Sequence, residues 1–230
     1  MEICGFQRLT LLDYPGRTAC TIFTGGCNFR CPFCHNASLV IDIDKSGQIS
    51  EDEFFDYLKK RQGVLDGVGI TGGEPLLHPE IVPFCEKIKS LDYDIKLDTN
   101  GSRPALLREL IDKGLVDYVA MDIKNSREKY AITAGIKNFD LAPIEESVSL
   151  LLENRVDYEF RTTVVNELHE KADFEKIAQW IQGAKRYFLQ NFVDSGNLLG
   201  IDYTPMPKDE MRQIALYMAD FVEVCETRGI

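Results

Sequence analysis

The chain has 230 residues, of which 44% are hydrophobic and 10% aromatic, and its formal net charge is −11 at pH 7. This length and composition fit one domain with an ample core. The acidic balance argues against a dedicated nucleic-acid binder, which would present a basic face. No apolar run approaches the length of a membrane span, and the N-terminus shows no basic and apolar leader. We therefore expect a cytoplasmic protein with neither nucleic acid nor membrane among its partners.

The first part of the chain predicts a hairpin and then a buried strand. Residues 3–12 run into the turn signal Pro15-Gly16, so we expect a short N-terminal hairpin in residues 1–17. The apolar run at 18–23 predicts a buried strand that leads directly into a loop rich in cysteine. Ser50 and Glu53 form a capping-box pattern, which predicts a helix at 50–60.

Strands and helices alternate in the rest of the sequence. We expect strands at 67–71, 94–97, 118–121, 158–165 and 186–190, and helices at 79–90, 104–113, 126–133, 142–154 and 171–181. One last helix is expected over 207–227, because apolar residues recur there at helical spacing: Met211, Ile214, Met218, Phe221 and Cys225.

This alternation predicts parallel βαβ units. About six such units are too few for a closed eight-fold barrel. The predicted fold class is therefore α/β, a partial open (βα)6 TIM-like barrel over 18–192 with the short N-terminal hairpin before it. A C-terminal loop and helix, residues 193–230, would pack on the barrel.

Polar residues recur where the predicted strands end. In parallel barrels the chemistry takes place at the carboxyl ends of the strands. Arg161 is the exception, because its strand continues past it. The pattern predicts a ligand site on one rim, together with the cysteine loop, from these residues: Glu74, Asp98, Asn100, Asp122, Lys124, Arg161 and Gln190.

The cysteine loop itself indicates an iron–sulfur cluster with an incomplete ligand set. Cys27, Cys31 and Cys34 follow a C-x3-C-x2-C spacing. A [4Fe–4S] cluster normally takes four thiolates, so three leave one iron open to a molecule other than protein. Zinc with His35 as fourth ligand is the alternative, but adjacent residues rarely both reach one tetrahedral ion. Seven cysteines are an odd number, and a reducing cytoplasm does not favour disulfides.

Other candidate residues carry no motif. His78 and His169 are expected at the surface or in capping roles, and Trp180 in the core. The remaining cysteines stand alone in apolar surroundings and are expected to pack as small hydrophobic residues: Cys4, Cys20, Cys85 and Cys225.

With these motifs, residues 18–192 resemble the radical S-adenosylmethionine superfamily. The resemblance rests on the cysteine spacing and on Gly-Gly-Glu-Pro at 72–75 after the next strand. Asp-Tyr-Pro-Gly at 13–16, Asp-Thr-Asn-Gly at 98–101 and Met-Asp-Ile-Lys at 121–124 are similar to the glycyl-radical-enzyme activating enzymes. The most similar group is the longer type of anaerobic ribonucleoside-triphosphate reductase activating protein, and the pyruvate formate-lyase activating enzyme is a close relative. Residues 36–51 contain no cysteine, which argues against the subgroup with a ferredoxin-like insert.

The resemblance implies two cofactors and their ligands. Cys27, Cys31 and Cys34 would hold a [4Fe–4S] cluster, and S-adenosylmethionine would chelate its open iron. The cofactor contacts that the resemblance implies are Phe33 at the adenine, Gly72, Gly73 and Glu74 at the methionine amino group, Lys124 at the carboxylate, Asp122 at the ribose, and Arg161 and Gln190. A monovalent cation at Asp98, Thr99 and Asp122 is also implied.

The implied activity is reductive cleavage of S-adenosylmethionine to a 5′-deoxyadenosyl radical that generates a glycyl radical on a large partner enzyme. Anaerobic (class III) ribonucleoside-triphosphate reductase is the first candidate partner, with flavodoxin or ferredoxin as electron donor in an anaerobic cytoplasm. Two alternatives stay open: an activase of another glycyl radical enzyme such as pyruvate formate-lyase, and a small-molecule enzyme similar to 7-carboxy-7-deazaguanine synthase. A plain iron–sulfur electron carrier or a zinc module would not explain the rim residues.

Overall fold

The computed structural model describes residues 1–41, 43, 46–194, 196, 198–200 and 202–230. Positions 42, 44 and 45 belong to the cysteine-free segment 36–51, and positions 195, 197 and 201 belong to the expected C-terminal loop. At those six positions the expectations lie outside the described residues.

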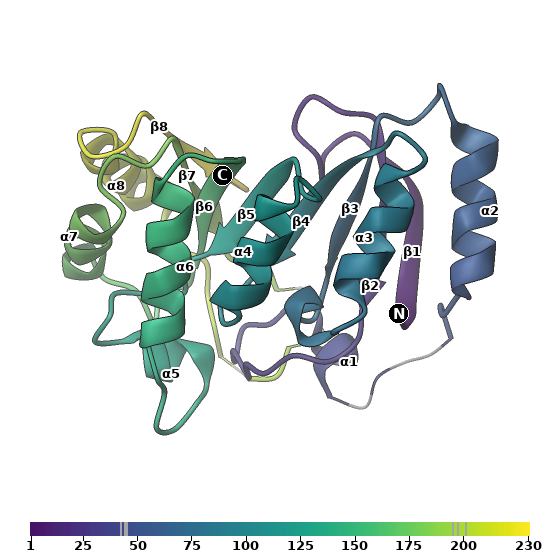
Figure 1. The fold of residues 1–230 in the computed structure, drawn as a ribbon. Helices are drawn as coiled ribbons and strands as arrows, with labels where there is room; N and C mark the ends of the chain where they lie inside the picture. Colours follow the sequence, from purple (N-terminus) through teal and green to yellow (C-terminus); the bar gives the residue numbers. More distant parts are fainter. Residues whose placement is uncertain (42, 44–45, 195, 197, 201) are drawn as a thin grey trace. The chain divides into compact units, whose positions relative to one another are not determined.

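The strands follow one another in chain order. Over the described residues the structure has one eight-stranded sheet of order β1 to β8 (Figure 1). The predicted alternation of strands and helices is confirmed, and the fold class is α/β. The strands are β1 Ile3–Thr10, β2 Ala19–Thr24, β3 Gly67–Gly72, β4 Asp94–Thr99, β5 Tyr118–Asp122, β6 Asp157–Val164, β7 Arg186–Asn191 and β8 Val224–Arg228.

The helices fall between these strands, as predicted for βαβ units. None in the described part of the chain is both long and apolar enough to cross a membrane. They are α1 Ala37–Val40, α2 Glu51–Arg61, the 3₁₀ turn η1 Pro75–Leu77, α3 Ile81–Lys89, α4 Pro104–Asp112, α5 Tyr130–Ala134, α6 Ala142–Leu152, α7 Lys171–Trp180 and α8 Lys208–Met218.

The chain forms two compact units. Unit 1 comprises Met1–Asn28, Ser38–Val119 and Arg155–Asp157, and unit 2 comprises Phe29–Ala37, Ala120–Asn154 and Tyr158–Ile230. Cys27 therefore belongs to unit 1, whereas Cys31 and Cys34 belong to unit 2. The predicted division at residues 17 and 192 remains a prediction.

In unit 1 the N-terminal hairpin extends beyond the predicted residues 1–17. β1 pairs antiparallel with β2, which is the strand predicted at 18–23, and β2, β3 and β4 pair in parallel. The hydroxyl of Ser50 accepts the main-chain N–H of Glu53 at 3.1 Å and caps α2 as predicted. Cys20 and Cys85 are buried in this unit, and burial raises the pKa of both thiols to about 12. They pack as the small hydrophobic residues expected.

Unit 2 is built on β6, β7 and β8, which pair in parallel. Its helix α7 begins with a capping box in which Glu170 and Asp173 bond each other's main-chain N–H. Trp180 is buried at the end of α7, with the Arg127 guanidinium 4.6 Å from its ring centroid. The core position predicted for Trp180 is confirmed.

The prediction of one helix over 207–227 is wrong in its second half. α8 ends at Met218, and β8 follows at Val224–Arg228 in parallel register with β7. Glu223 and Val224 donate their main-chain N–H groups to Ala184 and Lys185. The open edge of β7 supplies hydrogen-bond partners that a longer helix would leave unused, so tertiary pairing overrides the helical spacing. Cys225 therefore lies on a strand.

Helix α5 is also shorter than predicted. It begins at Tyr130 rather than at Ser126. The side chain of Asn125 accepts the N–H of Ser126 at 2.7 Å, and the Ser126 hydroxyl bonds Asp173 at 2.9 Å. Asn and Ser side chains that bond locally compete with helix formation, which explains the delayed start.

Candidate active site

In unit 1, the end of β3 is bonded to the start of the cysteine loop. Gly72 pairs with Thr24 at the carboxyl ends of β3 and β2. The N–H of Gly73 donates to the Thr24 carbonyl at 2.9 Å, and the N–H of Glu74 donates to the Gly26 carbonyl at 2.8 Å. The Gly-Gly-Glu segment thereby fixes the main chain directly before Cys27.

This contact requires glycine. A Cβ atom at Gly73 would overlap the carbonyl of Gly26, and one at Gly72, whose φ is +118°, would overlap the main chain of Thr24. The resemblance implied that Gly72 and Gly73 contact the cofactor. The structure gives these glycines a second role, because they allow the main chain at the end of β3 to lie close to the main chain that follows β2.

The carboxylate of Glu74 is fully buried and organises the end of β4. It accepts the Thr99 hydroxyl at 2.8 Å, the Asn100 N–H at 2.6 Å and the Leu76 N–H at 3.1 Å. A buried carboxylate needs such donors, because an unpaired charge in the interior is costly. Glu74 therefore couples the ends of β3 and β4.

Asn100 carries this coupling to the cysteine loop. Its side-chain amide donates to the side-chain oxygen Oδ1 of Asn28 at 2.9 Å and lies 3.8 Å from the sulfur of Cys27. The sequence predicted Asn100 as a rim residue, because it follows the predicted strand at 94–97. Its contact with Cys27 was not predictable from local sequence, since the two residues are 73 positions apart.

Two of the three residues predicted for a monovalent cation, Asp98 and Thr99, have other partners in unit 1. Asp98 forms an ion pair with the buried ammonium of Lys96. The Thr99 hydroxyl donates to Glu74 and accepts the N–H of Gly101. In the part of the chain that the structure describes, no group of three or more His, Cys, Asp or Glu side chains is arranged to hold a metal ion.

In unit 2, three predicted cofactor residues come together. Asp122, the last residue of β5, accepts Lys124 Nζ on one carboxylate oxygen at 2.8 Å and Arg161 Nε on the other. Arg161 reaches it from the middle of β6. All three side chains are mostly buried but keep some exposure. The three side chains thus form one charge cluster at a strand end.

The charges of the cluster stabilise one another. Burial alone would raise the pKa of Asp122, but Arg161 and Lys124 lower it well below the usual range. Burial alone would lower the pKa of Lys124, but Asp122, and then Cys31, hold it above its usual value. Asp122 and Lys124 are both charged near neutral pH. Lys124 thus places a cation near Cys31.

The second half of the cysteine loop rests on helix α5. The Arg30 N–H donates to the Ala134 carbonyl at 2.9 Å, and the Cys34 N–H donates to the Cys31 carbonyl at 3.0 Å. A Cβ atom at Gly135, whose φ is +68°, would overlap the carbonyl of Arg30. Glycine after a helix is a readable end signal, but its contact with the loop was not predictable from sequence.

Phe33 and His35 flank Cys34 in the same unit. Phe33 is buried. The His35 ring lies 5.6 Å from the Phe192 ring, centroid to centroid. Among the described residues, His35 Nε2 is the one buried side-chain nitrogen or oxygen without a hydrogen-bond partner. Burial, and then the charge of Lys124, lower the pKa of His35. A neutral imidazole with an unused polar atom fits a loop that holds a ligand.

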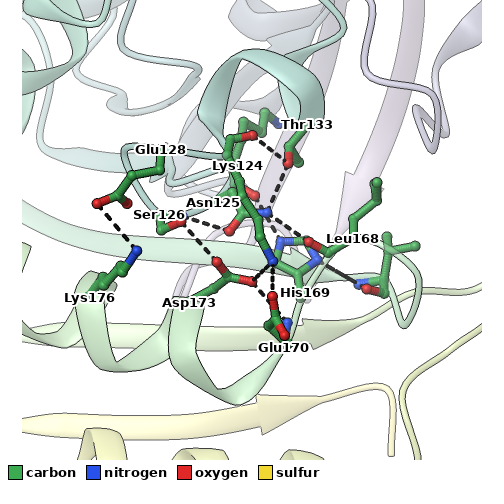
Figure 2. A network of polar contacts seen from close by, with 12 residues as sticks. Lys124, Asn125, Ser126, Glu128, Thr133, Leu168, His169, Glu170, Asp173 and Lys176 are labelled. Carbon is green, nitrogen blue, oxygen red and sulfur yellow. Dashed lines mark hydrogen bonds and ion pairs between the residues drawn. The ribbon is translucent and has the colours of Figure 1, made fainter.

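The two histidines without a motif both contact site segments. His78 Nε2 lies 2.9 Å from the carbonyl of Gly25, directly before the cysteine loop. His169 Nε2 lies 2.9 Å from the carbonyl of Lys124 (Figure 2). His169 is buried, so the expected surface position is wrong. Gln190 lies near the end of β7, opposite Thr163 of β6, where its cofactor contact remains a prediction.

Known proteins resemble this chain in sequence and in fold. A family model described as the Radical SAM superfamily matches residues 21–181. The chain is 31% identical over 241 aligned residues to a Methanocaldococcus jannaschii protein named "Putative glycyl-radical enzyme activating enzyme", which covers 99% of this chain and 96% of that protein. It is 32% identical over 151 residues to the 7-carboxy-7-deazaguanine synthase of Koribacter versatilis, covering 64% of this chain and 62% of that one.

A solved structure adds the likeness in fold. A domain of the pyruvate-formate lyase-activating enzyme from Bacteroides vulgatus matches with a TM-score of 0.58 at 16% identity. The match covers 71% of this chain and 99% of that domain.

The chain therefore belongs to the radical S-adenosylmethionine superfamily and is an enzyme. Its fold is the partial open α/β barrel that the sequence predicted. The predicted resemblance to glycyl-radical-enzyme activating enzymes is confirmed. The family implies a [4Fe–4S] cluster and S-adenosylmethionine as cofactors.

The contact between Gly73 and Gly26 gives a first prediction. Gly73→Ala should lower the free energy of unfolding by about 1–3 kcal/mol, because the strand end or the loop must shift. It should also lower the iron content after anaerobic reconstitution, since the loop before Cys27 moves. Gly5→Ala is the control, because a Cβ there meets only ordinary contacts at 3.4 Å. Urea unfolding and iron analysis measure both effects. Equal behaviour of the two variants would contradict the assigned role of Gly73.

The buried imidazole of His169 gives a second prediction. Burial lowers its pKa below 6.5, so the unfolded chain takes up a proton there before the folded chain does. The free energy of unfolding should therefore fall as the pH drops below 6.5, by at most about 1.4 kcal/mol for each unit by which folding lowers the pKa. Urea unfolding at pH 7.5 and 5.5 should show a smaller loss in His169→Gln than in the native protein. An equal loss would show that His169 does not contribute.

Proposed function

We propose that this protein is a glycyl-radical-enzyme activase that works with a [4Fe–4S] cluster held by Cys27, Cys31 and Cys34. The observation that carries the proposal is the charge cluster of unit 2, in which Lys124 pairs with Asp122 and adds its charge near Cys31. A cation beside a cluster ligand suits the carboxylate of a cofactor that chelates the open iron. The full-length similarity to an activating enzyme supports the same reading.

A cluster held by Cys27, Cys31 and Cys34 would supply the electron for the reductive cleavage of S-adenosylmethionine to methionine and a hydrogen-abstracting 5′-deoxyadenosyl radical. In the proposed site, Lys124 binds the cofactor carboxylate and Asp122 accepts a ribose hydroxyl. Arg161 pairs with the other carboxylate oxygen of Asp122 and balances its charge. The positive charge of Lys124 is then available to the cofactor carboxylate. These groups hold one another in place within unit 2, which reduces the cost of organising the site.

Further residues are proposed for the remaining parts of the cofactor. Phe33 would pack against adenine, and Gln190 would contact the cofactor from β7. The main chain of Gly72, Gly73 and Glu74 would receive the amino group, because the Glu74 carboxylate already accepts three protein donors. The unused Nε2 of His35 supports a ligand beside Cys34.

The cation, the partners and the location complete the proposal. A monovalent cation at Asp98, Thr99 and Asp122 would have to compete with Lys96 for Asp98. We propose anaerobic ribonucleoside-triphosphate reductase as the first partner, pyruvate formate-lyase as another, and flavodoxin or ferredoxin as electron donor in an anaerobic cytoplasm.

A second candidate function is chemistry on a small molecule. The similarity to 7-carboxy-7-deazaguanine synthase, at 32% identity over 151 residues, favours it. That match covers 64% of this chain, whereas the activating enzyme matches along 99%. We therefore place the activase first.

Electron paramagnetic resonance tests the activase directly. The reconstituted protein, reduced anaerobically with S-adenosylmethionine and a candidate glycyl radical enzyme, should give a glycyl doublet on that enzyme. The same partner with its radical glycine replaced by alanine is the control. Cleavage of S-adenosylmethionine without a doublet on any glycyl radical enzyme would favour the small-molecule function.

Lys124 gives a further prediction. Lys124→Met should weaken S-adenosylmethionine binding about 10- to 100-fold, which is the loss of one charge-assisted hydrogen bond. Lys176→Met is the control, because Lys176 is exposed and forms an ion pair with the exposed Glu128. Equilibrium dialysis of cluster-loaded protein measures the affinity. Unchanged affinity in Lys124→Met would remove Lys124 from the site.

A further inference from the structure

A buried polar network lies directly behind Lys124. It joins the segment after β5, residues 124–129, to the start of α7, residues 168–173 (Figure 2). The network belongs entirely to unit 2. The network is distinct from the Asp122 charge cluster. The charge cluster joins side chains, whereas the network bonds the main chain of Lys124.

His169 supplies the bond to Lys124 itself. Its Nε2 lies 2.9 Å from the Lys124 carbonyl, which can only accept, so Nε2 carries the proton. Nδ1 lies 3.1 Å from both the N–H and the carbonyl of Val165, and in this tautomer it accepts the N–H. This neutral tautomer satisfies both ring nitrogens. A buried histidine with both nitrogens used is fixed in orientation.

The neighbouring main chain is held by other groups. The carbonyl of Asp122 accepts the Tyr130 hydroxyl at 3.2 Å. Ile123 donates to the Arg161 carbonyl at 2.8 Å and accepts the Thr162 hydroxyl at 2.7 Å. His169 bonds the next residue, Lys124. Each of the three residues from Asp122 to Lys124 therefore has a hydrogen bond to its main chain.

The remainder of the network keeps His169 in place. Asn125 donates its side-chain amide to the Leu168 carbonyl and to the Thr133 hydroxyl, both at 2.9 Å. Asp173 accepts the Ser126 hydroxyl at 2.9 Å and Lys129 Nζ at 2.8 Å. The turn before α7 and the turn after β5 are therefore bonded to each other on both sides of the imidazole.

We infer that His169 is a positioning residue for cofactor binding, acting through the main chain of Lys124. The inference rests on the proposed function of Lys124 as the cofactor's carboxylate partner. A lysine side chain is long and flexible, so a defined position of its ammonium depends on a fixed backbone. His169 supplies that fixed point from outside the charge cluster, without touching the cofactor.

An adjoining cavity makes this role testable by chemical rescue. His169 lines a cavity of about 370 Å³ together with Phe174, Met206, Ile214 and Tyr217. Removing the side chain in His169→Gly should open a space continuous with that cavity. Free imidazole can enter it and donate to the Lys124 carbonyl.

The experiment measures the dissociation constant of S-adenosylmethionine on cluster-loaded protein, together with iron content. His169→Leu and His169→Gly should bind about tenfold more weakly, whereas His169→Gln, which keeps a donor near Nε2, should stay within about threefold of the native protein. Glu159→Gln is the matched control, since it removes the charge of another buried side chain of unit 2, which pairs with Arg228 at 3.0 Å. It should leave affinity unchanged.

Imidazole should restore affinity to His169→Gly, and 1-methylimidazole, which has no N–H, should not. The native protein with each additive controls for binding of the additive to iron.

The inference is overturned if His169→Leu binds like the native protein, if Glu159→Gln weakens binding equally, or if both additives rescue equally. If the native protein binds S-adenosylmethionine but activates no partner, the activase function is wrong and the role of His169 still stands. If the native protein does not bind S-adenosylmethionine, the activase function and the role of His169 are both wrong.

Discussion

The carboxylate of Asp122 lies at the end of a buried strand, where its negative charge would be unfavourable without the two cations that reach it. Lys124 comes from two residues along the chain, and Arg161 comes from the next strand. Without Asp122 the two cations would repel each other, and without either cation one oxygen of the mostly buried carboxylate would lose its donor, so the three groups depend on one another. The β5–β6 connection of unit 2 must bring Arg161 level with Asp122 for this cluster to form. The chemistry proposed for the protein depends on that alignment.

The cysteine loop is held by main-chain contacts rather than by its own side chains. Its start is bonded to the Gly-Gly-Glu segment in unit 1, and its middle is bonded to the end of α5 in unit 2. Gly73 and Gly135 permit these approaches, since a side chain at either would overlap a carbonyl of the loop. A loop fixed by its backbone leaves its thiolates available for ligation, and this is the preorganisation that a metal site needs.

Much of the fold was predictable because its determinants are local. Turn residues, capping patterns and apolar runs placed the strands and most helices, and the spacing of Cys27, Cys31 and Cys34 identified the superfamily. The failures came where a distant segment decided the outcome. The chain after Met218 forms a strand because β7 offers an open edge, and α5 starts late because Asp173 engages Ser126. Neither partner can be inferred from periodicity.

The sequence by itself determined which chemical groups are present and at which strand ends they lie, because spacing and alternation are properties of the chain alone. Only the tertiary structure decided what each group contacts. It assigned the Glu74 carboxylate to the end of β4, brought Asn100 to Cys27 and buried His169 behind Lys124. These contacts join residues 26, 73 and 45 positions apart. Contacts of that range form only when parallel pairing brings strand ends together, and no local pattern records them.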